Sequence, residues 1–361
     1  MMTSIKRYVL SGALLAALLM SVAPAQRPRR SSPRPKSGAP ALSRYRLESE
    51  RLFPHLSAKY IVRVIQKRGH YLILDSTNHR VIFVTPDGRM VRQLGRIGQA
   101  AGEFHYPNDM AVDAEGYIYV RDSMNRRYQV FRWDGAFVAQ FPNVPEAHGL
   151  AVTSKGEILI GQPQKGKLVS VYSRDGKLLR SFGELHKLSD FYGRSVADLD
   201  AAYKHAINRV KLCVDKRDNV YVAFIGAPVF QKYDASGRLV FEKKLVGQEA
   251  EEIIAGFQKR RQSPVRRGID DVPTPLIITG IAVDDATGNI YISFQWDRAW
   301  IYVADSKGDG LAILELPQRE LLLENLELSE DGSALLGARL SVVKTDEAYR
   351  FALPSPLRRR S

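Results

Sequence analysis

Acidic, hydroxyl, amide and guanidinium side chains stand together in "YVRDSMNRRYQVF", residues 119–131. Asp122, Ser123, Asn125, Arg126 and Arg127 fall within six consecutive positions between two apolar stretches. Groups of these types at this spacing could form a reactive site. They could equally shape the turn of a β-hairpin, where Asp and Asn side chains bond to their own backbone.

A second copy of the pattern favours the turn. The string "LILDSTNHRVIFV" places Asp75, Asn78 and Arg80 where Asp122, Asn125 and Arg127 stand. A catalytic set is needed once per protein, whereas this set recurs once per repeat. We therefore predict that Asp and Asn shape the turn, and that Arg127 bonds carbonyls or acids of a neighbouring repeat.

The elements that position these turns form six related units between about residue 60 and residue 352. Corresponding first-strand positions are 47, 40, 62, 69 and 45 residues apart, and they are Val64, Ala111, Ala151, Cys213, Ala282 and Glu327. The short steps suit a four-stranded propeller blade, and the long steps contain insertions.

Turn residues recur at the same place in successive units, as Asp87-Gly88, Asp134-Gly135 and Asp175-Gly176. Asp-Gly suits a tight hairpin that requires positive φ. Alternation in "YIYV" and "YQVF" suits strands packed between neighbouring sheets. We predict an all-β fold: a six-bladed β-propeller, residues 44–357, with four-stranded antiparallel blades.

Two partly helical insertions interrupt the repeat, at about 184–208 and 247–275. In the second, Ile253, Ile254 and Phe257 form an apolar stripe with charges opposite. Insertions in a propeller lie in loops over one face, where binding residues concentrate.

The sequence allows two ways of closing the ring of blades. A closed ring must remove its sheet edges. Either the last unit supplies all four of its strands, or a stretch between Arg44 and Lys59 lends one, with "RYRLES" as a candidate.

The second unit resembles an NHL repeat, a family in which Gly, Phe and Pro lead into an Asp-bearing first strand and Asp, Asn and Arg follow the second. The matching residues are Gly102, Phe104, Pro107, Asp113, Gly116, Asp122, Asn125, Arg127 and Phe131. The resemblance is specific for residues 70–140 and covers about 280 residues in weaker form. It implies a six-bladed propeller of the sort found in bacterial exported proteins, and it implies no single activity.

Some NHL-type propellers are zinc-dependent lyases, with His residues just ahead of the first strands. His148 stands at that position, but the other units carry Ile61, Asn108, Val210, Thr279 and Glu324 there. His105 and His205 lie at other offsets. A catalytic zinc needs about three protein ligands, so we predict no zinc site.

Lactonase-like propellers hold a divalent ion through Glu, Asn and Asp. Asn108, Asp109 and Glu324 are the available equivalents, and we interpret them as polar groups at a loop mouth. Asn108 and Asp109 could also turn the chain by bonding their own backbone. We expect no metal, no cofactor and no catalytic residue.

Nucleic-acid binding finds some support in "KRRQSPVRR", residues 259–267, since some NHL propellers bind RNA. The same insertion carries five acids, Glu249, Glu251, Glu252, Asp270 and Asp271. Affinity for phosphates requires a net positive patch, so we expect no nucleic-acid partner. "GQPQKGK", 161–167, lacks the spacing of a phosphate loop.

The chain ends are basic, while the repeats are nearly neutral. Residues 1–46 hold nine Lys and Arg and no acid, and Arg358, Arg359 and Arg360 follow at the other end. Of the net charge of +14, about +2 therefore belongs to residues 47–357.

The first 25 residues have the pattern of a signal peptide: Lys6 and Arg7, an apolar run to Met20, then Ala23-Pro24-Ala25. The alternative is an uncleaved anchor, but the run is shorter than the roughly 20 residues that a span needs. Residues 26–43 read as a disordered basic linker, either a solvated spacer or a contact for anionic envelope polymers. Residues 358–361 form a basic tail. We predict export to the periplasm or beyond, with no transmembrane anchor after cleavage.

Cys213 is the single cysteine, so no intramolecular disulfide can form. In "VKLCVD" we interpret it as a small buried hydrophobic residue.

Together these patterns predict an exported, non-catalytic binding or scaffolding propeller of the cell envelope. Its ligand would be a protein, peptide or glycan held over the channel. The alternatives are a metal-dependent envelope hydrolase or lyase and, third, a nucleic-acid-binding propeller. The predicted contacts are Asn108, Asp109, His148 and Arg209 at the blade entries and Phe191, Tyr192, Arg260 and Arg261 on the insertions, because aromatic and Arg groups make good anchors.

Overall fold

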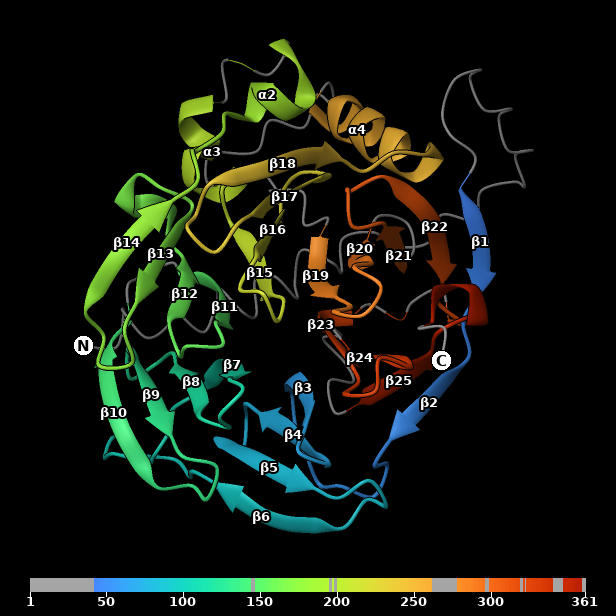
Figure 1. Cartoon of the computed structure of the whole chain (residues 1–361). Helices are drawn as coiled ribbons and strands as arrows, with labels where there is room; N and C mark the ends of the chain where they lie inside the picture. Colours follow the sequence, from blue (N-terminus) through green and yellow to red (C-terminus); the bar gives the residue numbers. More distant parts are fainter. Residues whose placement is uncertain are drawn as a thin grey trace.

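Six antiparallel sheets stand around a central axis in a computed structural model, which describes residues 42–143, 147–194, 197, 200–261, 278–295, 299–318, 321, 323–339 and 347–358 (Figure 1). The predicted six-bladed propeller is confirmed. The predicted signal peptide, residues 359–361 and residues 262–277 of the second insertion lie outside the described residues, as does the linker apart from Leu42 and Ser43.

Blades 1 to 3 each run from an innermost to an outermost strand in chain order. Blade 1 comprises β3 (Ile61–Lys67), β4 (His70–Asp75), β5 (Arg80–Val84) and β6 (Met90–Leu94). Blade 2 comprises β7 (Pro107–Val112), β8 (Ile118–Asp122), β9 (Arg127–Phe131) and β10 (Phe137–Pro142). Blade 3 comprises β11 (His148–Val152), β12 (Ile158–Gly161), β13 (Val169–Tyr172) and β14 (Leu178–Phe182), with a short 3-10 helix, η1 (Pro163–Lys165).

Blades 4 and 5 follow the same plan, and blade 6 takes three strands from the end of the chain. Blade 4 comprises β15 (Val210–Val214), β16 (Val220–Phe224), β17 (Val229–Tyr233) and β18 (Leu239–Lys244). Blade 5 comprises β19 (Ile278–Val283), β20 (Ile290–Gln295), β21 (Ala299–Ala304) and β22 (Gly310–Glu315). Blade 6 contains β23 (Leu323–Leu328), β24 (Ala334–Arg339) and β25 (Ala348–Ala352), followed by η4 (Ser355–Leu357).

The beginning of the described chain closes the ring. Strand β2 (Ser49–Leu52) pairs antiparallel with β25 and forms the outermost strand of blade 6. Strand β1 (Ser43–Arg46) pairs in parallel with β22, so blade 5 has five strands. Of the two closure solutions, the one in which an early segment lends a strand is therefore observed.

The hydrophobic core lies between neighbouring blades, because each sheet buries both of its faces. Between blades 2 and 3, for example, Tyr128, Phe141 and Tyr172 stack in succession, with ring centroids 5.1 and 6.1 Å apart. Gly176, at φ +85°, shows why Asp-Gly recurs: a Cβ there would collide with the Phe141 ring of the preceding blade.

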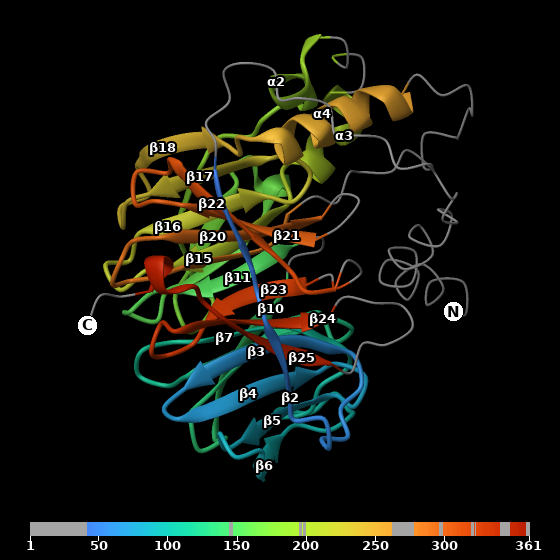
Figure 2. The same ribbon diagram turned by 90° about the vertical axis from the view of Figure 1, so that its right-hand side faces the viewer.

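In the described residues, three α-helices lie in the connections that lead from one blade to the next. Helices α2 (Leu188–Tyr192) and α3 (Asp200–Ile207) join β14 to β15, and α4 (Gln248–Arg261) follows β18. Figures 1 and 2 show them grouped beside β14 and β18, on the side of the ring from which the innermost strands start. No helix in the described part of the chain combines the length and apolarity needed to cross a bilayer.

Candidate functional site at the channel mouth

The six innermost strands begin around one end of the central channel, which we call the channel mouth. In five of them, all except β15, the pairing with the second strand shifts within the first few residues. Such bulges re-aim side chains and are common at the rims of barrels and next to active sites. They explain how isolated charged residues in otherwise apolar strands can point toward the axis.

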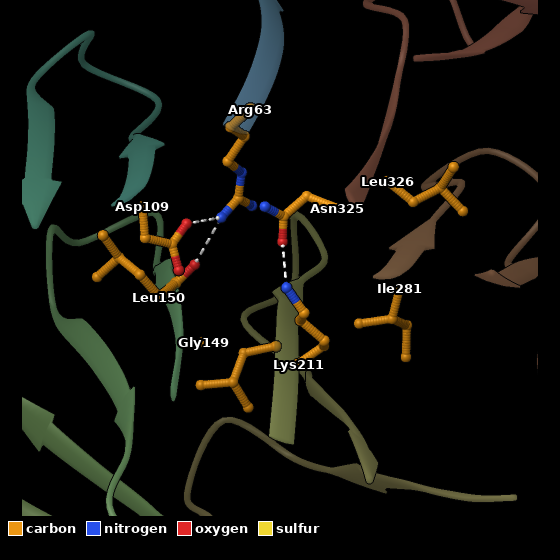
Figure 3. Close-up of a pocket in the computed structure, with 9 residues that line it drawn as sticks. Arg63, Asp109, Gly149, Leu150, Lys211, Ile281, Asn325 and Leu326 are labelled. Carbon is orange, nitrogen blue, oxygen red and sulfur yellow. Dashed lines mark hydrogen bonds and ion pairs between the residues drawn. The ribbon is translucent and has the colours of Figure 1, made fainter. Parts of the chain in front are cut away.

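Arg63 of β3 is the centre of the polar network in the channel (Figure 3). Its Nη1 donates to Asp109 Oδ1 at 2.6 Å and to the Leu150 carbonyl at 3.3 Å, and its Nε donates to Glu327 Oε1 at 2.7 Å. One side chain thus joins blades 1, 2, 3 and 6. Burial opposes the charge of Arg63, but the two carboxylates outweigh burial and raise its pKa.

Lys211 of β15 approaches the same pocket from blade 4. Its Nζ donates to Asn325 Oδ1 at 2.8 Å (Figure 3). Asn325 Nδ2 in turn donates to the Val62 carbonyl at 3.0 Å. Burial lowers the pKa of Lys211 and raises the pKa of Glu324, each opposed by attraction to the other. The pocket has room for about one water molecule, so the described side chains fill the channel here.

His148, at the start of β11, lies where cations gather. Burial holds the pKa of His148 well below its ordinary value, and Arg209, Arg121 and Lys211 lower it further. Since Asp109 and Glu327 are engaged by Arg63, the side of the mouth around His148 carries an excess of positive charge. The imidazole is therefore neutral at pH 7 and stands among charged donors.

The predicted contacts at the blade entries differ in how far they are exposed. Asn108 is exposed, and His148 and Arg209 are half-buried. Asp109 is buried, bonded to Arg63, and accepts the Met110 backbone N–H at 2.9 Å. The prediction that Asp109 is a surface contact is therefore wrong, because its carboxylate neutralises the central arginine.

The predicted aromatic anchors on the first insertion are also wrong. Phe191 is 7% exposed and packs on Phe224, with centroids 5.3 Å apart. Tyr192 is 1% exposed and donates its hydroxyl to the Gly226 carbonyl at 2.8 Å. Helix α2 is held to blade 4 by these rings, so they stabilise the insertion. Arg260 and Arg261 lie in α4, but their side chains are outside the described residues.

The repeated Asp, Asn and Arg residues tie each turn to the segment that enters its own blade. Asp122 Oδ1 accepts the His105 N–H at 2.7 Å, and Oδ2 accepts Asn125 Nδ2 at 2.8 Å and Arg127 Nε at 2.9 Å. Arg127 Nη2 also donates to the carbonyls of Ala100 and Glu103, between blades 1 and 2, at 2.8 Å.

Blade 1 repeats this arrangement. Asp75 Oδ1 accepts the Lys59 N–H at 3.0 Å, and Oδ2 accepts Asn78 Nδ2 at 2.9 Å and Arg80 Nε at 3.0 Å. Both aspartates are fully buried. Their carboxylates are therefore occupied by structural bonds.

Metal-ligating side chains do not gather at the channel in the described ranges, where no three His, Cys, Asp or Glu residues are placed to share an ion. Cys213 is half-buried, and burial raises the pKa of its thiol well above the ordinary value. That shift disfavours the thiolate form.

Four residues of this site were not predicted from the sequence: Arg63, Arg121, Lys211 and Glu327. One signal was available: "IVRVI" and "VKLCV" place a single charge inside an apolar strand, and buried charges are normally paired. Their partners lie up to 264 positions away, which spacing alone does not indicate.

Comparisons with known proteins agree with this architecture. A family model described as "6-bladed beta-propeller" matches residues 55–143. Protein brain tumor of Drosophila melanogaster is 25% identical over 123 residues, which cover 33% of this chain and 12% of that protein. Human NHL repeat-containing protein 3 is 26% identical over 182 residues, which cover 47% of this chain and 48% of that protein. The chain thus matches about half or less of the length of these relatives.

Three solved structures share the fold at low sequence identity. A putative exported protein of Bacteroides fragilis has a TM-score of 0.56 at 11% identity, covering 87% of this chain and 99% of that one. Regucalcin of Agrobacterium tumefaciens, described as calcium-binding, has a TM-score of 0.54 at 11% identity, covering 89% and 98%. An inactive virginiamycin B lyase from Staphylococcus aureus has a TM-score of 0.51 at 11% identity, covering 85% and 100%.

The fold and its polar channel place this protein in the class of six-bladed β-propellers. The residues of its repeats resemble NHL repeats, and about half of the chain is similar to NHL repeat-containing protein 3.

Proposed function

We propose that this protein is an exported, non-catalytic binding or scaffolding propeller of the cell envelope. It would hold a protein, peptide or glycan against the channel mouth. The proposal is supported chiefly by the filling of the channel: Arg63 is satisfied by Asp109 and Glu327, and the pocket beside it accommodates about one water molecule. A ligand larger than a water molecule is therefore expected to lie over the mouth.

Two further features support a binding surface on this face. The insertions lie in connections on the same side of the ring as the mouth (Figure 2). Helix α2 is fixed to blade 4 by buried rings, so it is a rigid mount. Rigid loops that project from a propeller are suited to partner recognition. The sequence pattern of residues 1–25 supports export.

Crosslinking in intact cells, followed by capture of the protein from the envelope fraction, tests the proposal. We expect wild-type protein to recover a defined partner and Asn108→Arg to recover at least about tenfold less, because Asn108 is exposed at the mouth. Arg132→Glu is the matched control, since Arg132 is an exposed turn residue of the same blade at the opposite end of β9. Equal recovery by wild type and Asn108→Arg would overturn the location of the binding surface.

Metal analysis separates the proposal from its main alternative, a metal-dependent hydrolase or lyase. Purified protein should carry less than stoichiometric zinc and calcium. Stoichiometric metal, lost together with stability in His148→Ala or Asn108→Ala, would replace the binding role with the enzymatic one.

A further inference from the structure

Between blades 2 and 3, beside the channel mouth, three buried donor groups have no acceptor among the residues that the structure describes. They are Arg121 Nε, the Tyr128 hydroxyl and Gln162 Nε2. Tyr128 is 1% exposed and Gln162 is fully buried. Buried donors are almost always paired, because an unpaired one costs about 1–3 kcal/mol. Three at one interface between blades require an explanation.

These donors belong to one surface. Arg121 of β8 lies directly opposite Asp109 of β7 and Tyr128 of β9 in the sheet register. Cross-strand partners share a face of the sheet, and this face of blade 2 packs on blade 3 through Tyr128, Phe141 and Tyr172. Tyr172 in turn donates to Gln162 Oε1 at 2.7 Å, and Gln162 Nε2 has no partner among the described residues.

The side chains around these unpaired donors carry positive charge. Arg121 makes no ion pair with any residue that the structure describes, in contrast to Arg63, Arg80 and Arg127. His148 and Lys211 lie close enough that Arg121 lowers the pKa of each. Asp109, which lies opposite Arg121 in the sheet register, is bonded to Arg63. The interface between blades 2 and 3 therefore has donors and positive charge, and Arg121 has no ion-pair partner among the described residues.

We propose that Arg121, Tyr128 and Gln162, with His148 and Lys211 at the rim, form a binding site for an oxyanion, a carboxylate or phosphate group carried by the ligand. This inference rests on the proposed function and supplies the chemistry of its ligand. A guanidinium binds such groups through two parallel hydrogen bonds. The phenol and amide donate to the remaining oxygen lone pairs, and Lys211 adds a point charge.

Titration with acetate and with inorganic phosphate, at constant ionic strength maintained by chloride, tests the site. The readout is the NMR signals of the His148 imidazole, identified with His148→Gln. We expect saturable shifts with at least one of the two anions, and the tighter of the two identifies the group. A linear shift with both would overturn the site and leave bridging waters as the acceptors.

Two conservative variants separate binding from folding. Tyr128→Phe removes an unpaired hydroxyl and should weaken anion binding at least fivefold without lowering stability. Tyr119→Phe is the control, because Tyr119 is equally buried in blade 2 but donates to Asp113 at 2.8 Å. It should lower stability and leave anion binding unchanged. Weaker binding in both variants, or in neither, would overturn the assignment.

Partner capture distinguishes the two proposals. If wild-type protein recovers a partner and Arg121→Gln recovers it equally well, the oxyanion site is wrong and the binding role stands. If wild-type protein recovers no partner while acetate or phosphate still binds saturably, the oxyanion site stands and the scaffolding role fails.

Discussion

At the scale of single residues, two arginines six positions apart illustrate opposite situations in one blade. Arg127 is 12% exposed and is bonded to Asp122, Gln140 and two backbone carbonyls. Arg121 has a buried Nε that finds no acceptor in the described part of the chain. The bonds of Arg127 stabilise the fold. The unpaired Nε of Arg121 lowers stability but can bind a ligand, a trade-off that is common at functional sites.

Arg127→Met should therefore lower the free energy of unfolding by about 3 kcal/mol, because it leaves the Asp122 carboxylate buried without its counter-ion. Urea denaturation measures the change. Arg132→Met, an exposed turn variant of the same blade, should stay within about 0.5 kcal/mol of wild type. Equal stability of the two variants would show that the Arg127 bonds contribute nothing net.

The depressed pKa of His148 predicts that the free energy of unfolding decreases as the pH falls. Because its folded-state pKa is depressed, the unfolded chain takes up the proton first as the pH falls. The contribution of neutral His148 to stability is thus complete above its ordinary pKa of 6.5 and is lost as the pH falls below that value. We expect wild type to lose more stability than His148→Gln between pH 7.5 and 5.5, by at most about 1.4 kcal/mol per pH unit below 6.5. Parallel pH profiles in urea denaturation would contradict the assignment; His79 is common to both proteins, so its titration cancels.

At the scale of elements, the sequence predicted what is local and repeated. Asp-Gly turns and strand alternation identify hairpins because turn conformation depends on adjacent residues, and the Asp-Gly pair recurs at the same place in three successive units. Phe191 and Tyr192 were misassigned because a short aromatic helix can face solvent or pack on its blade, and only the position of Phe224 decides. The Arg63 network joins strands far apart in the chain, so its pairings depend on the closed ring.

Strand β2 is the element on which closure depends. It pairs with β25 over four residues, and Leu52 packs among buried residues of blades 1 and 6 such as Ile61 and Leu336. A chain that begins at Leu47 lacks β1 and its ion pair from Arg44 to Glu249. A chain that begins at Phe53 lacks β2 as well and exposes β25 as an unpaired edge, which invites aggregation.

We expect the chain that begins at Leu47 to melt cooperatively at a somewhat reduced temperature. The chain that begins at Phe53 should lose its cooperative transition and elute as aggregate. Circular dichroism melting and size-exclusion chromatography measure both. Identical melting of the two shortened chains would mean that blade 6 is stable with three strands.

At the scale of the whole molecule, contacts between turns link most blades on the face opposite the mouth. Glu330 of blade 6 accepts the Arg68 and Gly69 backbone N–H groups of blade 1 at 2.7 and 3.0 Å. Arg174 of blade 3 donates to Asp113 of blade 2 at 3.1 Å, and Ser154 of blade 3 donates to Asp218 of blade 4. These ties connect neighbouring blades at that face. Residues 47–357 contribute only about +2 of the net charge of +14, so the basic excess of the protein lies elsewhere.

That excess belongs to the chain ends, where residues 26–41 and 359–361 carry seven Lys and Arg and no acid. Clustered charges of one sign attract anionic polymers through long-range electrostatic forces, which salt screens. We predict that a chain comprising residues 26–361 binds polyglutamate, and that raising the salt from about 50 to 300 mM weakens the binding at least tenfold. A chain comprising residues 42–358 should bind at least tenfold more weakly at low salt while retaining its fold, as measured by fluorescence anisotropy of labelled polyglutamate. Equal binding by both chains would mean that the propeller itself binds polyglutamate. Weaker binding by Arg121→Gln would then identify the channel mouth as the binding surface.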